Sequence, residues 1–409
     1  MQDRMSDRSR ARAVALAALV CLVPAAAAGQ TGDTMPPAPA RLLVGGDLSG
    51  IFGPSDAIAF FNYTDYEHNA LRLARIRLYG EWRVSPLVSF IGELRTEDID
   101  SIEASAAYVR VRPWADRAIT IQAGRIPPVI GAFSRRAYGR DNPLIGLPLA
   151  YQYLTSLRPD AVPATVDDLI RMRARGWQPD FPVGSKVIGP GMPLVSASRW
   201  STGVEVRWQR DWFEAAGAWS LGPPGMPAAV DFTAGRQISG RAAIVLPAGA
   251  TVGVSAAHGR WIDEDVLALV PADRRDRSAQ TTVGVDAEIG SGPWLLRAEW
   301  LRTSYALPWT DPPASPADVS AWSGFVEARR RLHARWQIAV RLDRLSFSSL
   351  TGSTGVTTGW DAPIERVETA VAFRVTRRLE VRGGWQHNWR EAGRVRERGF
   401  PAVQALFWF

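Results

Sequence analysis

The sequence predicts an all-β fold, a transmembrane antiparallel β-barrel of about sixteen strands. Three observations support this prediction. The chain begins with a segment typical of exported proteins, no later stretch has the roughly 18 consecutive apolar residues of a membrane-spanning helix, and alternating apolar and polar residues recur along the remainder. Because lipid offers no partners to backbone groups, an exported chain that spans a membrane without such helices must form a closed barrel.

The first forty residues are predicted to precede the barrel. A cluster of arginines from Arg4 to Arg12 is followed by the apolar run 13–23 and the small residues 25–28, which is the layout of a secretory signal peptide. We therefore assign residues 1–28 to a cleaved signal peptide, 29–40 to a periplasmic N-terminal segment and 41–409 to the barrel. Cys21 is the only cysteine, so the exported chain is expected to fold without disulfides.

Alternation with a period of two predicts the strands. On one predicted strand Val204, Val206 and Trp208 would face lipid, while the polar residues between them would face inward. In a soluble β-sandwich the polar face would look outward instead. The predicted strands begin near these residues: Arg41, Ala70, Leu87, Ile102, Ala118, Ser201, Trp212, Arg236, Ala250, Thr281, Pro293, Ala321, Trp336, Glu365, Arg378 and Gly399.

The connections between the predicted strands alternate in length. Tight turns such as 210–211 and 376–377 alternate with longer segments, of which the third, 126–200, is the longest; only 96–101 interrupts the pattern. Periplasmic turns and external loops of outer-membrane barrels differ in this way. Tryptophans gather near both ends of the predicted strands, as in the two aromatic girdles at the membrane interfaces.

The last strand carries a resemblance to a known family. Val403, Ala405, Phe407 and the terminal Phe409 resemble the C-terminal signal of bacterial outer-membrane barrels, which the barrel-assembly machinery reads. With the strand count and the long third loop, the chain resembles the bacterial outer-membrane porins, of general or anion-selective type. The segment from Gly124 to Gly131 is similar to the anion-selective porins, whereas the Pro-Glu-Phe-Gly-Gly-type loop motif of the family is not present.

The resemblance has several implications for location and partners. It implies an outer-membrane protein in contact with lipid and lipopolysaccharide, whose third loop folds into the lumen of the barrel. It leaves open whether three barrels associate as a homotrimer.

Charged residues at inward positions are the candidate site. Strands two to four carry an excess of arginine, and we expect this basic sector to face the carboxylates of the third loop across a constriction and to favour anions. The alternative is that the charges only neutralise each other and stiffen the barrel. The candidate residues are Arg75, Arg77, Arg110 and Arg112 on the wall and Arg135, Arg136, Arg140, Asp141, Asp167 and Asp168 in the loop.

Other functional classes are disfavoured by the sequence. The hydrolase, phosphate-loop and zinc-protease motifs are missing, and the four histidines are scattered, so we expect no enzyme, metal site or cofactor. A net charge of +7 would suggest nucleic acid for a cytosolic protein, but the predicted export argues against that partner. The predicted function is passive diffusion of small hydrophilic solutes, with a mild anion preference. The alternative is a barrel plugged by 126–200 that serves as a structural anchor or surface receptor.

Overall fold

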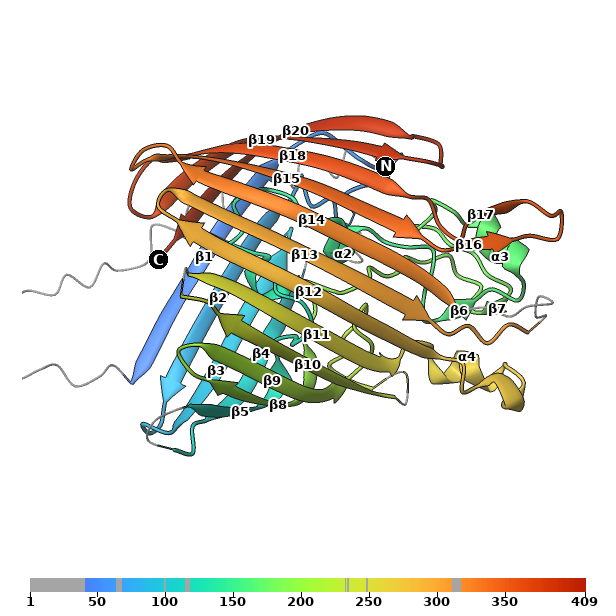
Figure 1. The fold of residues 1–409 in the computed structure, drawn as a ribbon, viewed down its shortest axis with the longest axis horizontal. Coiled ribbons are helices and arrows are strands. Elements are labelled where there is room, and N and C mark those ends of the chain that lie inside the picture. Colours follow the sequence, from blue (N-terminus) through green and yellow to red (C-terminus); the bar gives the residue numbers. More distant parts are fainter. Residues whose placement is uncertain are drawn as a thin grey trace, which may run out of the picture. The chain divides into compact units, whose positions relative to one another are not determined.

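A computed structural model describes residues 41–409 apart from 64–67, 99–100, 115–117, 232, 234, 248 and 311–317. Within this part of the chain, sixteen antiparallel strands form one closed barrel (Figure 1). The strands are β1 (Leu42–Phe52), β2 (Ala74–Arg83), β3 (Val88–Glu97), β4 (Ser101–Val111), β5 (Ile119–Ile126), β8 (Ser201–Gln209), β9 (Phe213–Leu221), β10 (Arg236–Val245), β11 (Ala250–Arg260), β12 (Ala279–Ser291), β13 (Trp294–Tyr305), β14 (Val319–Arg331), β15 (Trp336–Phe347), β18 (Ile364–Arg374), β19 (Leu379–Arg390) and β20 (Glu397–Trp408).

Each strand pairs with its neighbour in the chain, and β1 pairs with β20 to close the barrel. The seam runs from Asp47 opposite Trp408 to Phe52 opposite Val403. Beyond β20, the backbone N–H of Phe409 donates to the carbonyl of Gly46 at 3.1 Å, and the N–H of Gly46 donates back at 3.2 Å. The C-terminal residue therefore forms part of the closure.

The predicted sixteen-stranded antiparallel barrel is confirmed. The alternation is also confirmed on β8, where Val204, Val206 and Trp208 are exposed and Glu205 between them is buried. The predicted strand near Ala70 begins later, at Ala74, because the apolar residues before it do not face lipid. Leu71 and Leu73 are almost fully buried, and Leu71 belongs to the main apolar cluster of the interior.

Tight connections lie at one end of the strands and longer segments at the other, with α3, α4, β16 and β17 beyond the longer-loop end (Figure 1). The longest segment, residues 127–200, is called the long loop below. It contains η1 (Ser134–Arg136), α2 (Leu149–Gln152), β6 (Ala161–Val162), α3 (Val166–Arg171) and β7 (Val183–Gly184). Other loops contain α4 (Glu264–Ala268), η2 (Ala272–Arg274), β16 (Ser349–Thr351) and β17 (Thr357–Gly359). None of the helices in the described residues is both long and apolar enough to cross a membrane.

Helix α3 begins with a capping box. The Thr165 hydroxyl accepts from the backbone N–H of Asp168 at 3.1 Å, and the Asp168 carboxylate accepts from the backbone N–H of Thr165 at 3.0 Å. The two contacts satisfy donors that a helix start leaves free. The helix ends at Arg171.

The main apolar core lies among loops and inward-facing residues. Its largest cluster joins Leu149 and Leu157 of the long loop to Trp261, Trp309 and Trp360 of other loops. A second cluster joins Phe133 and Tyr151 of the long loop to Leu301 and Phe325 on the inward face of β13 and β14. The long loop is thus packed against other loops and against inward-facing residues of the wall.

Candidate functional site

The long loop is attached to the inward face of β13 through Glu299. The backbone N–H groups of Ala132 and Phe133 donate to one oxygen of this carboxylate at 2.7 and 3.2 Å. The hydroxyl of Tyr151 donates to its other oxygen. Burial, followed by the nearby Glu299 charge, raises the pKa of Tyr151, so this phenol remains a proton donor across the physiological range. Glu299 therefore holds two separate parts of the long loop.

A second attachment lies on β15 and β18. The N–H groups of Ile145 and Gly146 donate to the Glu368 carboxylate at 3.1 and 2.6 Å, and that of Leu149 donates to Asp343 at 2.5 Å. The guanidinium of Arg341 donates to the other oxygen of Glu368 at 2.7 Å and to the Gly146 carbonyl at 2.9 Å. Arg341 and Glu368 are at most 2% exposed, which indicates that water is excluded around this contact.

Further arginines of the wall donate to carbonyl groups of the long loop. Arg382 on β19 contacts the carbonyl of Asn142 at 2.7 Å. Arg366 on β18 contacts that of Leu147 at 3.0 Å, and Arg297 on β13 contacts that of Asp141 at 2.9 Å. Arginine suits this task because its fixed fork of donors can bind a carboxylate and a carbonyl at the same time.

A cavity lies between the first part of the long loop and strands β8 to β10. Its volume is about 220 Å³, and we call it the arginine cavity. Small residues of the loop and wall leave the space open, while four arginines and one carboxylate line it. The lining residues are Val129, Gly131, Ala132, Arg135, Arg136, Arg207, Glu214, Ala216 and Arg241.

The arginines of the cavity are held from behind by carboxylates. Arg207 contacts Glu205 at 2.7 Å and also pairs with Glu214. Arg241 donates to Asp286 at 2.6 Å. Because Glu205 and Asp286 are not among the lining residues, the surface that faces the cavity is more basic than the whole network.

The two loop arginines of the cavity have their own carboxylate partners. Arg135 lies 3.4 Å from Glu205, which it shares with Arg207, and Arg136 pairs with Glu288 on β12. About a third of each arginine side chain is exposed. The positive charges of Arg135 and Arg136 are therefore accessible from the cavity.

The predicted basic sector of β2 to β4 lies elsewhere and is neutralised by the wall. Arg75 pairs with Glu97 at 2.9 Å, and Arg77 pairs with Asp47 at 2.5 Å. Arg110 is 3.8 Å from Glu81. We expected this sector to face the carboxylates of the third loop across a constriction; in the structure these three arginines pair with carboxylates of the wall, as in the neutralising alternative. Their carboxylate partners belong to the wall and lie on β3, β1 and β2, respectively.

The long loop still meets this sector, through the ring of Tyr138 and through the carbonyl of Ser198, which accepts from Arg95. The guanidinium of Arg75 lies 4.2 Å from the ring centroid of Tyr138, and that of Arg95 lies 5.1 Å from it. Arg140 stacks over the ring of Trp408 at 4.6 Å, near the seam between β20 and β1. The backbone N–H of Arg112 donates to the Leu87 carbonyl at 2.8 Å next to a tight turn, away from the long loop.

The predicted loop carboxylates are dispersed. Asp141 is exposed and uses its backbone carbonyl to bind Arg297. Asp167 accepts from the backbone N–H of Ser353 at 3.0 Å in the loop that carries β16 and β17, and hydrogen bonding to the side chain and then the backbone of Ser353 lowers the pKa of Asp167. Asp168 caps α3. Thus only Arg135 and Arg136 of the predicted residues line the arginine cavity.

The sequence contains a signal for the residues that were missed. Arg207 stands between the outward Val206 and Trp208, so its inward position could be read from the alternation. Arg241 is inward on β10, where its neighbours Gly240 and Ala242 give only a weak contrast. Their proximity to Arg135 depends on the path of the long loop, which alternation does not describe.

The other candidate residues and sites can also be placed. Phe407 and Phe409 lie at the end of the seam with ring centroids 6.3 Å apart. Across the described ranges, no group of three or more His, Cys, Asp or Glu side chains is arranged to hold a metal ion.

Comparisons with known proteins agree on the fold. No family model and no curated protein matches the sequence. Among solved structures, a trimer form of OmpT, an outer membrane protein of Vibrio cholerae, matches with a TM-score of 0.54 and 9% identity, over 90% of this chain and 99% of that chain. The anion-selective porin from Comamonas acidovorans matches with a TM-score of 0.52 and 9% identity, over 90% and 99%. OmpF of Salmonella typhi in complex with daunomycin matches with a TM-score of 0.52 and 12% identity, over 90% and 97%.

These matches define the class of the protein. The chain forms a closed antiparallel β-barrel with the fold of the bacterial outer-membrane porins. The predicted resemblance is confirmed at the level of fold, without a match between sequences. The prediction that the chain is not an enzyme agrees with this fold, because the matched structures are porins and channels.

Proposed function

We propose that the protein is a porin through which small hydrophilic solutes diffuse passively, with a mild preference for anions. The long loop narrows the lumen, and solutes pass it through the arginine cavity. Arginine stays charged at any physiological pH, and clusters of arginine favour anions in aqueous pores. The anion-selective porin from Comamonas acidovorans, which has the same fold, supports this choice of solute class.

The arginine cavity is the observation that carries the proposal. Four arginines and a single carboxylate, Glu214, face a space of about 220 Å³ beside the long loop. A solute in this space would be within reach of the positive charges, whereas most of the carboxylates that hold them stand behind. Salt screens such a field over roughly 8–10 Å, so the preference should weaken as the ionic strength rises.

The plugged barrel is the competing proposal, and it also has a structural basis. The long loop is bound to Glu299, Asp343 and Glu368, which belong to three different strands. A loop attached at so many points moves little and would block the lumen. Such a plugged barrel would serve as an anchor or surface receptor. Single-channel conductance in planar bilayers separates the two proposals, because a plugged barrel should pass almost no current.

Reversal potentials in a KCl gradient test the anion preference. We expect the wild type to favour chloride, Arg136→Gln to shift the potential toward potassium, and Glu214→Gln to shift it further toward chloride. Arg344→Gln is the matched control, because it removes the same charge from a side chain on the outward face that is paired with Glu365. A wild type that prefers potassium, or equal shifts in Arg136→Gln and Arg344→Gln, would contradict the role of the arginine cavity.

We further propose how the protein is exported, inserted into the outer membrane and assembled. Residues 1–28 act as a signal peptide and residues 29–40 remain in the periplasm; both ranges lie outside the described residues. The barrel-assembly machinery inserts the chain, and the barrel then contacts lipid and lipopolysaccharide. The trimer form of OmpT from Vibrio cholerae makes a homotrimer the oligomer to test. The mass of the present protein in mild detergent shows whether three copies associate.

A further inference from the structure

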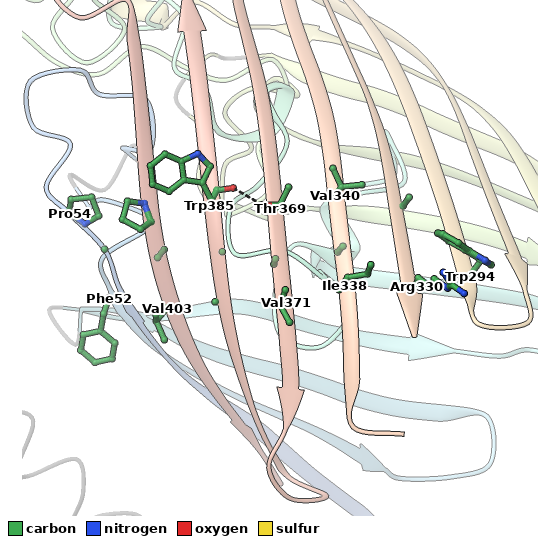
Figure 2. Close-up of a pocket in the computed structure, with 18 residues that line it drawn as sticks. Phe52, Pro54, Trp294, Arg330, Ile338, Val340, Thr369, Val371, Trp385 and Val403 are labelled. Atoms are coloured by element: carbon green, nitrogen blue, oxygen red, sulfur yellow. Dashed lines mark hydrogen bonds between the residues drawn. The ribbon is translucent and has the colours of Figure 1, made fainter. Parts of the chain in front are cut away.

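A groove of about 1120 Å³ lies on the outward face of strands β14, β15, β18, β19 and β20 (Figure 2). Its position outside the barrel follows from the alternation, because Ile338, Val340 and Val371 are exposed while Ala339 and Ala370 between them are buried. Almost all of the lining is apolar. We call this feature the outer groove.

The outer groove follows a row of residues that face each other across neighbouring strands. Arg330 pairs with Ile338, Ile338 with Val371, Val371 with Gly383 and Gly383 with Val403. Neighbouring strands are about 4.8 Å apart, so the three steps from Arg330 to Gly383 cover about 14 Å. Because barrel strands tilt by about 35–45°, this row rises only about 9 Å along the membrane normal, which stays within one lipid leaflet of about 15 Å.

The groove exists because a side chain is missing at its centre. A Cβ atom placed on Gly383 would meet nothing within 4 Å. The neighbouring Trp385 does not fill the gap, because its ring lies against Gly399, where an added Cβ would be only 2.2 Å from the indole. The backbone of Trp385 is fixed to Thr369, whose hydroxyl donates to the Trp385 carbonyl at 3.4 Å (Figure 2).

One end of the groove carries a positive charge. The guanidinium of Arg330 lies 5.0 Å from the ring centroid of Trp294, and both side chains are exposed at the end of the strands where tight turns connect them (Figure 2). Within the described part of the chain, Arg330 has no carboxylate at salt-bridge distance, whereas the outward Arg344 pairs with Glu365 at 3.3 Å. Tight turns mark the periplasmic side of such barrels, and tryptophan marks the interface.

We propose that the outer groove binds one anionic phospholipid of the periplasmic leaflet. An acyl chain lies along the row over Gly383, and the phosphate group binds Arg330 beside Trp294. The concave apolar floor stays within one leaflet, and Arg330 at the interface has no carboxylate partner in the described residues; together these features fit this ligand. Lipopolysaccharide belongs to the opposite leaflet, away from Arg330.

The experiment compares lipid retention in the full mature protein. Wild type and variants are purified in mild detergent, exposed to phosphatidylglycerol or phosphatidylcholine, and analysed by native mass spectrometry. We expect the wild type to keep one phosphatidylglycerol and Gly383→Leu to lose it, because leucine fills the centre of the groove. Arg330→Gln should bind phosphatidylglycerol about fivefold more weakly, the effect of one arginine near a membrane surface.

Two matched controls are present in the chain. Gly217 on β9 is an outward glycine with nothing within 4 Å of an added Cβ, so Gly217→Leu adds the same bulk outside the groove. Arg302 on β13 is an exposed arginine 5.8 Å from the Trp322 ring, so Arg302→Gln removes the same kind of charge. Both should retain the lipid as the wild type does.

Several outcomes would overturn the proposal. Equal lipid retention by the wild type, Gly383→Leu and Arg330→Gln would show that the groove holds no specific lipid. If Gly383→Leu leaves lipid retention unchanged but converts an oligomer to a monomer, the groove is a contact between copies of the chain. If Gly383→Leu fails to fold, Arg330→Gln still tests the phosphate contact through its preference for phosphatidylglycerol over phosphatidylcholine.

Discussion

Replacing Glu368 by alanine should release the middle of the long loop. The variant removes the acceptor for the N–H groups of Ile145 and Gly146 and one of the two carboxylate partners of Arg341. Each buried donor left without a partner costs about 1–3 kcal/mol, and breaking a buried ion pair costs about 3–5 kcal/mol. The loop can offset part of this cost by moving into water, so we expect the docked state to lose about 3 kcal/mol.

Hydrogen exchange measures this change directly. A loss of about 3 kcal/mol corresponds to roughly a hundredfold faster exchange of the amides at 145 and 146. In the proposed porin, the released loop should also change the single-channel conductance. Glu365→Ala is the control on the same strand, because Glu365 is exposed and its pair with Arg344 contributes only about 0–1 kcal/mol.

The result that would refute this reasoning is unchanged exchange at Ile145 and Gly146 in Glu368→Ala. In that case the other wall contacts of the loop, such as those with Asp343 and Arg382, would hold it without Glu368. Faster exchange with unchanged conductance would separate the two claims: the tether would be correct, but the middle of the loop would not limit the current.

Three further predictions concern assembly, pH and strain. Phe409→Ala keeps the backbone pair with Gly46, so it should refold in detergent as the wild type does but reach the membrane of cells in lower yield; equal yields would contradict a recognition role for the ring. Burial, with the charges of Asp160 and Asp265, raises the pKa of Asp263 to about 7, so the loop that carries it should become less protected in hydrogen exchange as the pH rises from about 4 to 7; Asp263→Asn should abolish this dependence. Gly124→Ala should destabilise the barrel by about 1–3 kcal/mol in denaturant titrations, because φ is +128° and its Cβ would lie 2.3 Å from the Ala107 carbonyl; a stability equal to that of the wild type would show that the strand adapts.

The strands were predictable because their signal is local. A barrel strand in lipid must alternate, and the residues from Val204 to Trp208 show this without knowledge of any other strand. The predicted strand bounds are wrong where apolar residues are buried by loops and do not face lipid. Leu71 and Leu73 precede β2 and are apolar because loops bury them, so alternation placed the start of that strand too early.

The partners of the charged residues were not predictable in the same way. Asp47, which pairs with Arg77, lies on β1, and its role becomes visible only when the register of β1 and β2 is known. Arg135 and Arg207 share Glu205 because the long loop returns to β8 after leaving β5. No periodicity describes such a path, so the excess of arginine was visible while its position around the pore was not.

The attachment of the long loop has a consequence for the order of assembly. The N–H of Ile145 and the carboxylate of Glu368 are 223 positions apart in the chain, and Asn142 and Arg382 are 240 apart. These contacts cannot form until β18 and β19 have been added to the barrel. Contacts between residues far apart in the sequence also form slowly. The part of the loop around residues 142–146 must therefore remain undocked while these later strands are added. Its docking and the pairing of β20 with β1 would then be among the last steps, so an incomplete barrel would remain open inside as well as at its seam.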